Sequence, residues 1–317
     1  MTAGALSLAR LLRDFPDLGA AIRGADRAAA TDAPVLILGE PGTGRSTLAR
    51  AIHAASPRAA GPLVEVDPGA VPSALFESEL FGYRAGAFTG AQSASEGRVA
   101  RAQGGTLVLD HLEELPLAAQ PKLLRLIAER RYAPLGGAET AADLRFVALS
   151  DDDLTSRVAR GAFRADLFYR LEVVAFRLPP LRERPQDLPA ILDELLADLA
   201  ERFGRPGLAL APAARSWMLR HPWPGNLRQV RNVLERGLIF AGDGPLDPAP
   251  PEGVLAASSA AGGWVPREAR PRSLVEVERE QILAALAYTR GHQAKAASLL
   301  GISRKSLWER RRRHGIP

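Results

Sequence analysis

Cysteine is absent from this sequence of 317 residues, which excludes disulfides and thiolate metal sites. No apolar run reaches the roughly 18 residues of a membrane-spanning helix, and no charged segment followed by an apolar one marks a secretory signal. Lysine is nearly missing, because only Lys122, Lys295 and Lys305 stand among 41 basic residues. We therefore expect a soluble, cytoplasmic protein without a membrane partner, in which arginine supplies the positive charge.

The charge that is present is concentrated at one end. The formal net charge of +5 is reached within residues 301–317 alone, where Glu309 is the single acidic residue, so the rest of the chain is neutral overall. A basic segment confined to a short terminus indicates a nucleic-acid partner. The hydrophobic content of 46% supplies enough apolar side chains for two or three domain cores.

Short apolar runs bounded by turn residues alternate with segments of helical periodicity. The runs lie at 34–38, 62–66, 106–110, 144–149 and 173–178. Strands that alternate with helices favour an α/β fold, in which a parallel sheet is covered by helices on both faces. From residue 187 the pattern becomes all-helical, which predicts a small helical bundle ending near residue 240.

Composition and periodicity divide the chain into five predicted segments. Residues 241–271 are rich in Pro, Gly, Ala and Ser and lack periodicity, as linkers do. The segments are an N-terminal helical extension at 1–33, an α/β core at 34–180, an α-helical lid at 181–240, the linker at 241–271 and a helix-turn-helix domain at 272–317. The extension is too short for a sensory domain of ordinary size.

Residues 39–46 read GEPGTGRS, close to the phosphate-loop pattern G-x-x-x-x-G-K-[ST] between a strand and a helix. Backbone N–H groups of such a loop, with the N-terminus of the following helix, form an anion cradle. Arg45 stands where the pattern has Lys, and a planar guanidinium does not replace a compact ammonium, so we expect weaker but persistent phosphate binding. Predicted nucleotide-binding residues are Gly39, Glu40, Pro41, Gly42, Thr43, Gly44, Arg45, Ser46 and Thr47, with Ser46 as a Mg²⁺ ligand.

The stretch ESELFGYRAGAFTGA (77–91) resembles the signature of bacterial enhancer-binding proteins, the NtrC-type AAA+ activators of sigma-54 RNA polymerase. The resemblance extends over roughly residues 34–240 and 272–317. It implies an AAA+ P-loop NTPase core with an all-α lid, ATP and Mg²⁺ as ligands, and assembly into a ring, a hexamer in our expectation. In this family, the last six residues of this stretch (86–91, GAFTGA) form the end of a loop that contacts the sigma factor. The implied sigma-contact residues are Gly86, Ala87, Phe88, Thr89, Gly90 and Ala91.

The segment GGTLVLDHLEELP (104–116) resembles the family's Walker B strand, in which an Asp-Glu pair follows the apolar run. The resemblance gives Asp110 the Mg²⁺ role and puts His111 where the family's residue polarises the attacking water. An imidazole can accept a proton near neutral pH, but its shape differs from that of a carboxylate. Using Glu113 or Glu114 instead would need a register shift, and we favour a place for both at the solvated start of the next helix.

Two further positions near this centre depart from the family's pattern. The family usually carries Asn at the position of Asp67, where it holds the catalytic Glu until nucleotide is sensed. Because both members of that pair have changed here, a hydrogen-bonded pair of Asp67 and His111 is our hypothesis for the substitute. The sensor strand ends in Leu149-Ser150-Asp151 instead of Thr with Asn or His, which assigns Ser150 to nucleotide binding and brings a carboxylate near the γ-phosphate.

Other motifs match the family closely. FRADLFYRL (163–171) resembles its FREDLFYRL, so Arg164 and Arg170 match arginine fingers that neutralise charge on a neighbouring subunit's phosphate. WPGNLRQVRN (223–232) matches the second sensor motif and implies that Arg228 lies over the nucleotide. Intact fingers imply that a ring can still assemble.

The C-terminal stretch HQAKAASLLGISRKSLWERRRRHGIP (292–317) has the pattern of a helix-turn-helix and resembles the family's Fis-type module. We predict an apolar face of Ala294, Ala297, Leu299 and Leu300, a turn at Gly301 and a helix N-cap at Ser303. We expect Trp308 to pack in the core and not to contact a base. The alternative is a charged, solvated terminal helix. Predicted DNA-binding residues are Ser303, Arg304, Lys305, Ser306, Arg310, Arg311, Arg312 and Arg313.

These features predict a DNA-binding transcriptional regulator that binds ATP, an upstream enhancer and sigma-54 RNA polymerase. Loss of a group that activates the attacking water commonly costs about a hundredfold to ten-thousandfold in rate, so we expect weakened hydrolysis. Whether the chain is a working ATPase is left open by Arg45 and His111. The alternative is a hydrolysis-defective, nucleotide-gated repressor or mixed-ring partner. A third hypothesis, a remodelling ATPase unrelated to transcription, does not account for the 86–91 loop or the basic C-terminus.

With no sensory domain in the sequence, we expect control to come from another protein, from expression level or from a domain lost by truncation.

Overall fold

The computed structural model describes residues 7–151, 153–240, 244–248, 282–283, 285–286, 289, 292–300 and 302–314. The chain forms two compact units, Met1–Glu252 and Gly253–Pro317, which we describe separately. Gly301, the side chain of Leu299 and most of the predicted linker lie outside the described residues. The five segment boundaries drawn from the sequence remain predictions.

A parallel five-stranded sheet forms the centre of the first unit. Its order is β2-β5-β8-β1-β9, with crossovers between neighbours that require helices on the faces. The strands are β1 (Val35–Leu38), β2 (Leu63–Val66), β5 (Thr106–Leu109), β8 (Arg145–Ser150) and β9 (Val174–Arg177). Each lies within or overlaps one of the five predicted runs, and the predicted α/β class is confirmed.

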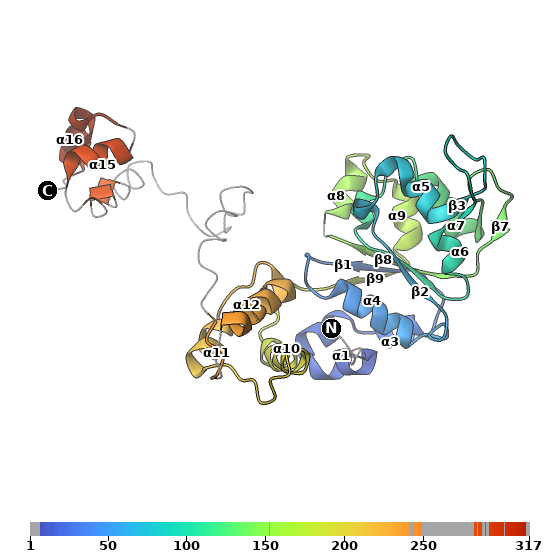
Figure 1. Cartoon of the computed structure of the whole chain (residues 1–317), viewed down its shortest axis with the longest axis horizontal. Coiled ribbons are helices and arrows are strands. Elements are labelled where there is room, and N and C mark those ends of the chain that lie inside the picture. Colours follow the sequence, from blue (N-terminus) through green and yellow to red (C-terminus); the bar gives the residue numbers. More distant parts are fainter. Residues whose placement is uncertain are drawn as a thin grey trace. The chain divides into compact units, whose positions relative to one another are not determined.

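Helices cover both faces of this sheet (Figure 1). Side chains alternate across β1: Val35 and Ile37 belong to one buried apolar cluster, and Leu36 and Leu38 to the other. On the first face lie α1 (Leu8–Asp14), α2 (Pro16–Ala21), α3 (Ala25–Ala29) and α4 (Arg45–Ala54). On the second lie α5 (Ser73–Phe81), α6 (Arg98–Arg101), α7 (Gln120–Glu129), α8 (Leu154–Ala159) and α9 (Ala165–Leu171). Two-sided burial explains why the central strands β1 and β5 are buried throughout and mostly apolar.

The N-terminal helices share the core of this unit. Phe15 and Ile22 lie in the same buried cluster as Leu48 of α4. Arg145 at the start of β8 is fully buried and donates from Nη1 and Nη2 to the carbonyls of Ala29 and Ala28, at 3.0 and 2.8 Å. These bonds join the C-terminal end of α3, where the Ala28 carbonyl also accepts from the Thr31 N–H at 3.1 Å, to the buried guanidinium. The N-terminal helices are thereby fixed to the sheet.

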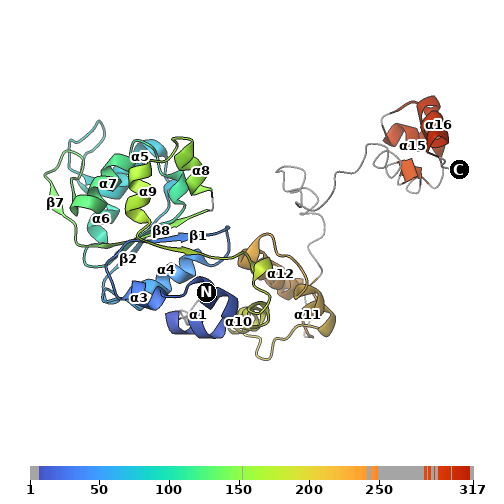
Figure 2. The same ribbon diagram turned by 180° about the vertical axis from the view of Figure 1, so that it is seen from behind.

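The lid follows the sheet as three helices that Figure 2 shows beside the N-terminal ones: α10 (Leu188–Arg202), α11 (Pro212–Met218) and α12 (Asn226–Phe240). Trp223 is fully buried among them, and its indole N–H donates to the Met218 carbonyl at 2.8 Å. Trp223 and Asn226 both adopt positive φ angles, of 48° and 51°. This turn places the start of α12 beside the phosphate loop, where the Leu227 N–H donates to the Gly42 carbonyl at 3.0 Å.

The second unit contains α15 (Gln293–Leu299) and α16 (Arg304–Arg313). Its small core includes Ala296, Ala297 and Leu307, with Leu300 packed against it. Ala297 and Leu300 are where the sequence predicted them, but Ala294 is exposed and Ala296 is fully buried in its place. Across the described parts of both units, no helix combines the length and apolar character needed to span a membrane.

Candidate functional site

The phosphate loop connects β1 to α4 through three glycines with positive φ angles. Gly42 and Gly44 have φ of 83° and 106°, and Gly39 has 151°. A Cβ atom at Gly42 would lie 2.8 Å from the Gly225 carbonyl oxygen, so the close approach of the lid to the loop also requires glycine there. Helix α4 begins at Arg45 with its first N–H groups beside the loop, as an anion cradle needs.

Arg45 folds back over the loop that carries it. Its side chain is 6% exposed, Nη1 donates to the Gly39 carbonyl at 2.9 Å, and Nη2 lies 4.0 Å from the Asp110 carboxylate. The chain's own groups therefore engage this cation. A bound phosphate would share this guanidinium, which has five N–H donors, with the Gly39 carbonyl and the Asp110 carboxylate.

Ser46 and Asp110 come together at the C-terminal edge of the sheet. The Ser46 hydroxyl is 3.4 Å from Oδ2 of Asp110, while Oδ1 accepts from the His111 N–H at 2.9 Å. Hydroxyl and carboxylate oxygens beside a phosphate cradle are the donors that Mg²⁺ takes, with further ligands from phosphates and water. The residues present therefore fit the predicted metal.

His111 and Asp67 form the hydrogen bond that the sequence led us to hypothesise. His111 Nδ1 lies 3.1 Å from Asp67 Oδ2, and the other oxygen of this carboxylate accepts from the Gly69 N–H at 2.9 Å. His111 has φ 52° and ψ 50°, a left-handed conformation that directs its side chain toward the turn at Asp67. Because an ionised carboxylate only accepts hydrogen bonds, this contact requires the proton on Nδ1, which would leave Nε2 as the acceptor of the ring.

The expectation for Glu113 is wrong. Glu113 is 9% exposed, and its Oε2 accepts from the Ser150 hydroxyl at 2.7 Å and from the Asp151 N–H at 3.3 Å. A short 3₁₀ turn, η2 (Leu112–Glu114), separates Asp110 from α7 and rotates position 113 inward. Glu114 is exposed, as expected, and lies 3.7 Å from Arg157. No residue pattern signals the 3₁₀ turn, because E-E before a proline is equally typical of a helix start.

Asp151 stands beside this buried carboxylate at the end of the sensor strand. Burial, and next the charge of Glu113, raise the pKa of the Asp151 carboxyl above its usual range. The neutral acid is thereby favoured more than in water. A hydrogen-bond donor is a better neighbour for a γ-phosphate than a second negative charge.

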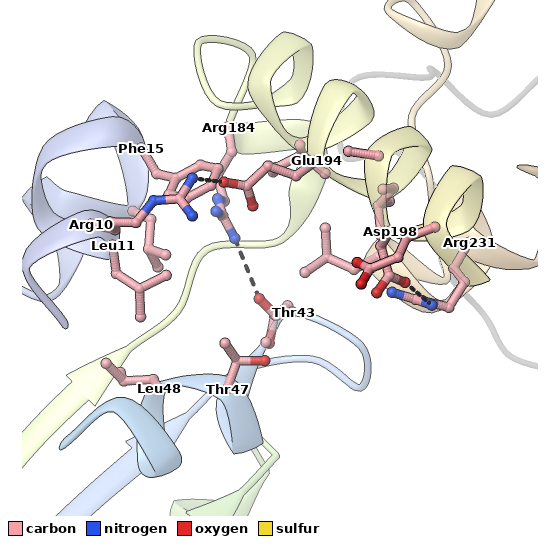
Figure 3. Close-up of a pocket in the computed structure, with 17 residues that line it drawn as sticks. Arg10, Leu11, Phe15, Thr43, Thr47, Leu48, Arg184, Glu194, Asp198 and Arg231 are labelled. Atoms are coloured by element: carbon pink, nitrogen blue, oxygen red, sulfur yellow. Dashed lines mark hydrogen bonds and ion pairs between the residues drawn. The ribbon is translucent and has the colours of Figure 1, made fainter. Parts of the chain in front are cut away.

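A cavity of about 400 Å³ opens beside the phosphate loop, between the N-terminal helices and the lid (Figure 3). Arg10 contacts Glu194 at 2.5 Å, and Arg231 contacts Asp198 at 2.9 Å, along its edges. Apolar side chains and the small loop residues surround the interior, among them Leu11, Phe15, Leu18, Thr43, Gly44, Thr47, Leu195 and Leu227. An apolar cavity with a few polar groups suits a flat base and sugar. The sequence could not reveal it, because helices distant along the chain contribute its walls.

The lid is fastened to the phosphate loop by polar contacts. Asn226 Nδ2 donates to Glu40 Oε2 and to the Pro41 carbonyl, both at 3.1 Å, and Arg182 Nη2 donates to Glu40 Oε1 at 2.7 Å. The Arg182 guanidinium lowers the pKa of the Glu40 carboxyl. Arg228 follows in α12, where its backbone lies next to Gly42 and its side chain is exposed. Arg228 is therefore beside the phosphate loop, and its sensor role remains a prediction.

The two predicted fingers lie on the helix α9 and at its start. Arg164 is 44% exposed and pairs with Asp166 at 2.7 Å. Arg170 is also exposed, with Nη2 3.5 Å from the Ala128 carbonyl. Exposure is what a residue needs if it acts on a neighbouring subunit.

Residues 86–91 form a closed turn between two short strands, β3 (Gly82–Tyr83) and β4 (Ser95–Glu96). The Gly86 N–H donates to the Ala91 carbonyl at 2.8 Å, and the Ala91 N–H donates to that of Phe88 at 3.0 Å. Phe88 is 42% exposed, and its ring meets the edge of Tyr83 with centroids 5.0 Å apart. The loop thus presents an aromatic side chain at the surface.

In the C-terminal unit, Ser303 caps α16: its hydroxyl accepts from the Ser306 N–H at 3.1 Å, as predicted. Arg304 and Lys305 are exposed in the first turn. The expectation for Trp308 is wrong, because its side chain is 55% exposed. Leu307 fills the core in its place, since adjacent helical positions point about 100° apart.

Three family models match the sequence. The Sigma-54 interaction domain matches residues 12–177, the AAA+ ATPase lid domain matches 182–255, and the Fis family of bacterial regulatory proteins matches 273–314. Together they leave only residues 1–11, 178–181, 256–272 and 315–317 unmatched.

Curated relatives match over nearly the whole chain. The alginate biosynthesis transcriptional regulatory protein AlgB of Pseudomonas aeruginosa is 43% identical over 302 residues, which are 95% of this chain and 66% of that protein. The Nif-specific regulatory protein of Azotobacter vinelandii is 42% identical over 284 residues, 89% of this chain and 54% of that protein. This chain thus spans one half to two thirds of these relatives.

Among solved structures, NtrX from Brucella abortus in complex with ATP is similar, with 30% identity and a TM-score of 0.70. The match covers 95% of this chain and 68% of NtrX. A structure of Hsp104, with 17% identity and a TM-score of 0.54 over 74% of this chain, shares the fold.

Proposed function

Because this chain belongs to the sigma-54-dependent regulators that join an AAA+ domain to a Fis-type helix-turn-helix, we propose that it is a DNA-binding transcriptional regulator with weakened ATP hydrolysis. It binds ATP beside the phosphate loop, contacts sigma-54 RNA polymerase through residues 86–91 and binds upstream enhancer DNA through its C-terminal unit.

The observation that carries the weakened hydrolysis is the geometry at His111. The residue after Asp110 is an imidazole bonded to Asp67 at 3.1 Å, where the family has a carboxylate that activates water. Whereas a carboxylate offers two oxygens, the ring offers one nitrogen, Nε2, as a hydrogen-bond acceptor for water. A water held by it takes a different position relative to the γ-phosphate, and displacement of a reacting atom by about 1 Å can cost a hundredfold in rate.

Nucleotide binding depends on other groups and is proposed to persist. The cradle at Gly42 and Gly44 has the required backbone, and the adjoining cavity of about 400 Å³ suits a nucleoside. Ser46 and Asp110 would hold Mg²⁺, which when bound neutralises phosphate charge. Arg45, Arg228 and the fingers of a neighbouring subunit supply the remaining cations. The similar NtrX was solved in complex with ATP, which supports the same ligand here.

The partner contacts follow from exposed features. Phe88 and Thr89 lie at the surface of a turn whose glycines, Gly86 and Gly90, have positive φ angles of 80° and 104°, and exposure is what contact with another protein requires. Exposed Arg164 and Arg170 suit a ring, and we propose a homo-hexamer. The basic helix α16 suits the DNA backbone.

A second candidate is a nucleotide-gated DNA-binding repressor or mixed-ring partner that never turns ATP over. Two contacts of Arg45 favour this candidate: its bond to the Gly39 carbonyl and its proximity to the Asp110 carboxylate. In this arrangement the cation of the phosphate loop interacts with the chain's own groups, as in a state without turnover.

Steady-state ATP hydrolysis across a protein concentration series, with fluorescent ATP-analogue binding in parallel, tests the proposal. We expect binding with slow or no turnover, and faster turnover in His111→Glu. Fast turnover that rises cooperatively with concentration and collapses in Arg164→Ala would instead establish an unimpaired motor. Binding that His111→Glu leaves without turnover would favour the second candidate.

A further inference from the structure

Helix α16 carries a large aromatic side chain on its outward side. Trp308 is 55% exposed, while the preceding Leu307 is 1% exposed and belongs to the core. A tryptophan that packs inside a domain removes about 150–250 Å² from water, so this small unit forgoes an available contribution to its stability. Tryptophan and arginine are enriched among the residues that contribute most to binding interfaces.

The neighbours of Trp308 indicate what it binds. Arg304 and Arg312 lie four residues before and after it, so all three share one face of the helix. The Arg312 guanidinium carbon is 5.7 Å from the ring centroid, a cation–π distance. A ring flanked by cations suits a partner that presents apolar groups close to negative charge. The major groove of DNA does so, because thymine methyl groups lie there between the phosphate strands.

We propose that Trp308 is a specificity-determining residue of the DNA complex, with its ring against the 5-methyl group of a thymine. The contact between ring and cation holds the side chain of Arg312 in place to reach an adjacent phosphate. This inference rests on the proposed DNA binding and adds a preference for thymine to it. Arg304 and Lys305 do not supply this preference, because cationic side chains prefer guanine in the major groove.

The test uses the full chain and short duplexes that it selects from a randomised library. Each thymine of the selected site is then replaced in turn by deoxyuridine, which lacks only the methyl group. We expect wild-type affinity to fall about fourfold at one thymine of each half-site, the effect of one buried methyl group. In Trp308→Ala this replacement is expected to have no effect, while Trp308→Phe keeps part of it.

Arg313→Ala is the matched control on the same helix. Loss of a phosphate contact weakens all duplexes alike and lowers the slope of log affinity against log salt by about one. If Trp308→Ala behaves in the same way and keeps every thymine sensitivity of the wild type, the inference is overturned.

Two readouts keep the outcomes apart. Because Leu307 and not Trp308 fills the core, circular dichroism and thermal unfolding of Trp308→Ala are expected to match the wild type. If the wild-type chain enriches no sequence from the library, the proposed DNA binding itself fails. If it enriches a site whose thymines all tolerate deoxyuridine, DNA binding stands and the role of Trp308 is refuted.

Discussion

The two sides of the nucleotide site depart from the family's pattern to different extents. Arg164 and Arg170, which we propose act on a neighbouring subunit, match the pattern, as does the loop at 86–91. The side that the chain presents to its own nucleotide differs at Arg45, Asp67, His111 and Asp151. Surfaces for assembly and partner contact can thus persist while the groups for water activation change, because the two sets of residues do not touch the same atoms.

The altered side is nevertheless well connected. Asp67 bonds to His111, and Asp151 shares the buried Glu113 with Ser150. Without the bond between them, the buried Glu113 and Ser150 would each lose a partner, which is costly, whereas Asp67 and His111 are partly exposed. The new residues therefore form a different set of hydrogen bonds in the same space, and the predictions below separate that set from the unchanged side.

The largest effect is expected when both Asp67 and His111 are replaced by the residues that the family carries at these positions. Asp67→Asn combined with His111→Glu is predicted to raise ATP turnover by about a hundredfold to ten-thousandfold, because a carboxylate again activates the water. His111→Glu alone is expected to gain less, since Asp67 would face a second carboxylate. Stopped-flow phosphate release measures both. Glu114→Gln, a nearby exposed carboxylate, serves as control, and equal turnover in all variants would show that the pair does not limit hydrolysis.

Gly42→Ala is expected to weaken ATP binding by about tenfold or more. The new Cβ would meet the Gly225 carbonyl at 2.8 Å and separate the lid from the loop, in addition to the roughly 1 kcal/mol cost of a positive φ. Gly161→Ala has a similar φ of 71° and open space, so it reports the backbone cost alone. Isothermal titration with ATP compares them. Identical affinities would mean that the contact of lid and loop does not support the site.

A smaller effect on stability should distinguish two adjacent carboxylates. Glu113→Ala removes hydrogen bonds to a buried charged group and is expected to lower the free energy of unfolding by about 1.5–3 kcal/mol. Glu114→Ala, at an exposed position, is expected to change it by less than about 1 kcal/mol. Urea titration followed by circular dichroism gives both values. Equal losses would contradict the inward orientation of Glu113.

The smallest effect concerns pH. Burial, and next the charge of Arg145, lower the pKa of the His53 ring, whose Nδ1 lies 2.9 Å from the Thr106 hydroxyl. The folded state then binds a proton less readily than the unfolded one, so the contribution of His53 to stability is full above pH 6.5 and is lost as pH falls from there through the folded pKa. His53→Gln should flatten the dependence of unfolding free energy on pH in that window. An unchanged slope would assign it to His221, whose pKa burial also lowers.

The sequence by itself determined the family, the α/β class and the order of the motifs. Strands such as the one at 34–38 could be predicted because burial on both faces makes the run continuously apolar. The phosphate-loop glycines could be recognised because their backbone angles disfavour other residues. The N-cap at Ser303 followed from local chemistry alone.

Only the tertiary structure decided the inward turn of Glu113, the outward face of Trp308 and the cavity between helices distant in sequence. Each depends on which way a short element is rotated when it packs, and a one-residue change of register in a helix moves a side chain by about 100°. Composition cannot specify that rotation. The packing of Leu307 and of the 3₁₀ turn at 112–114 against their cores fixes it.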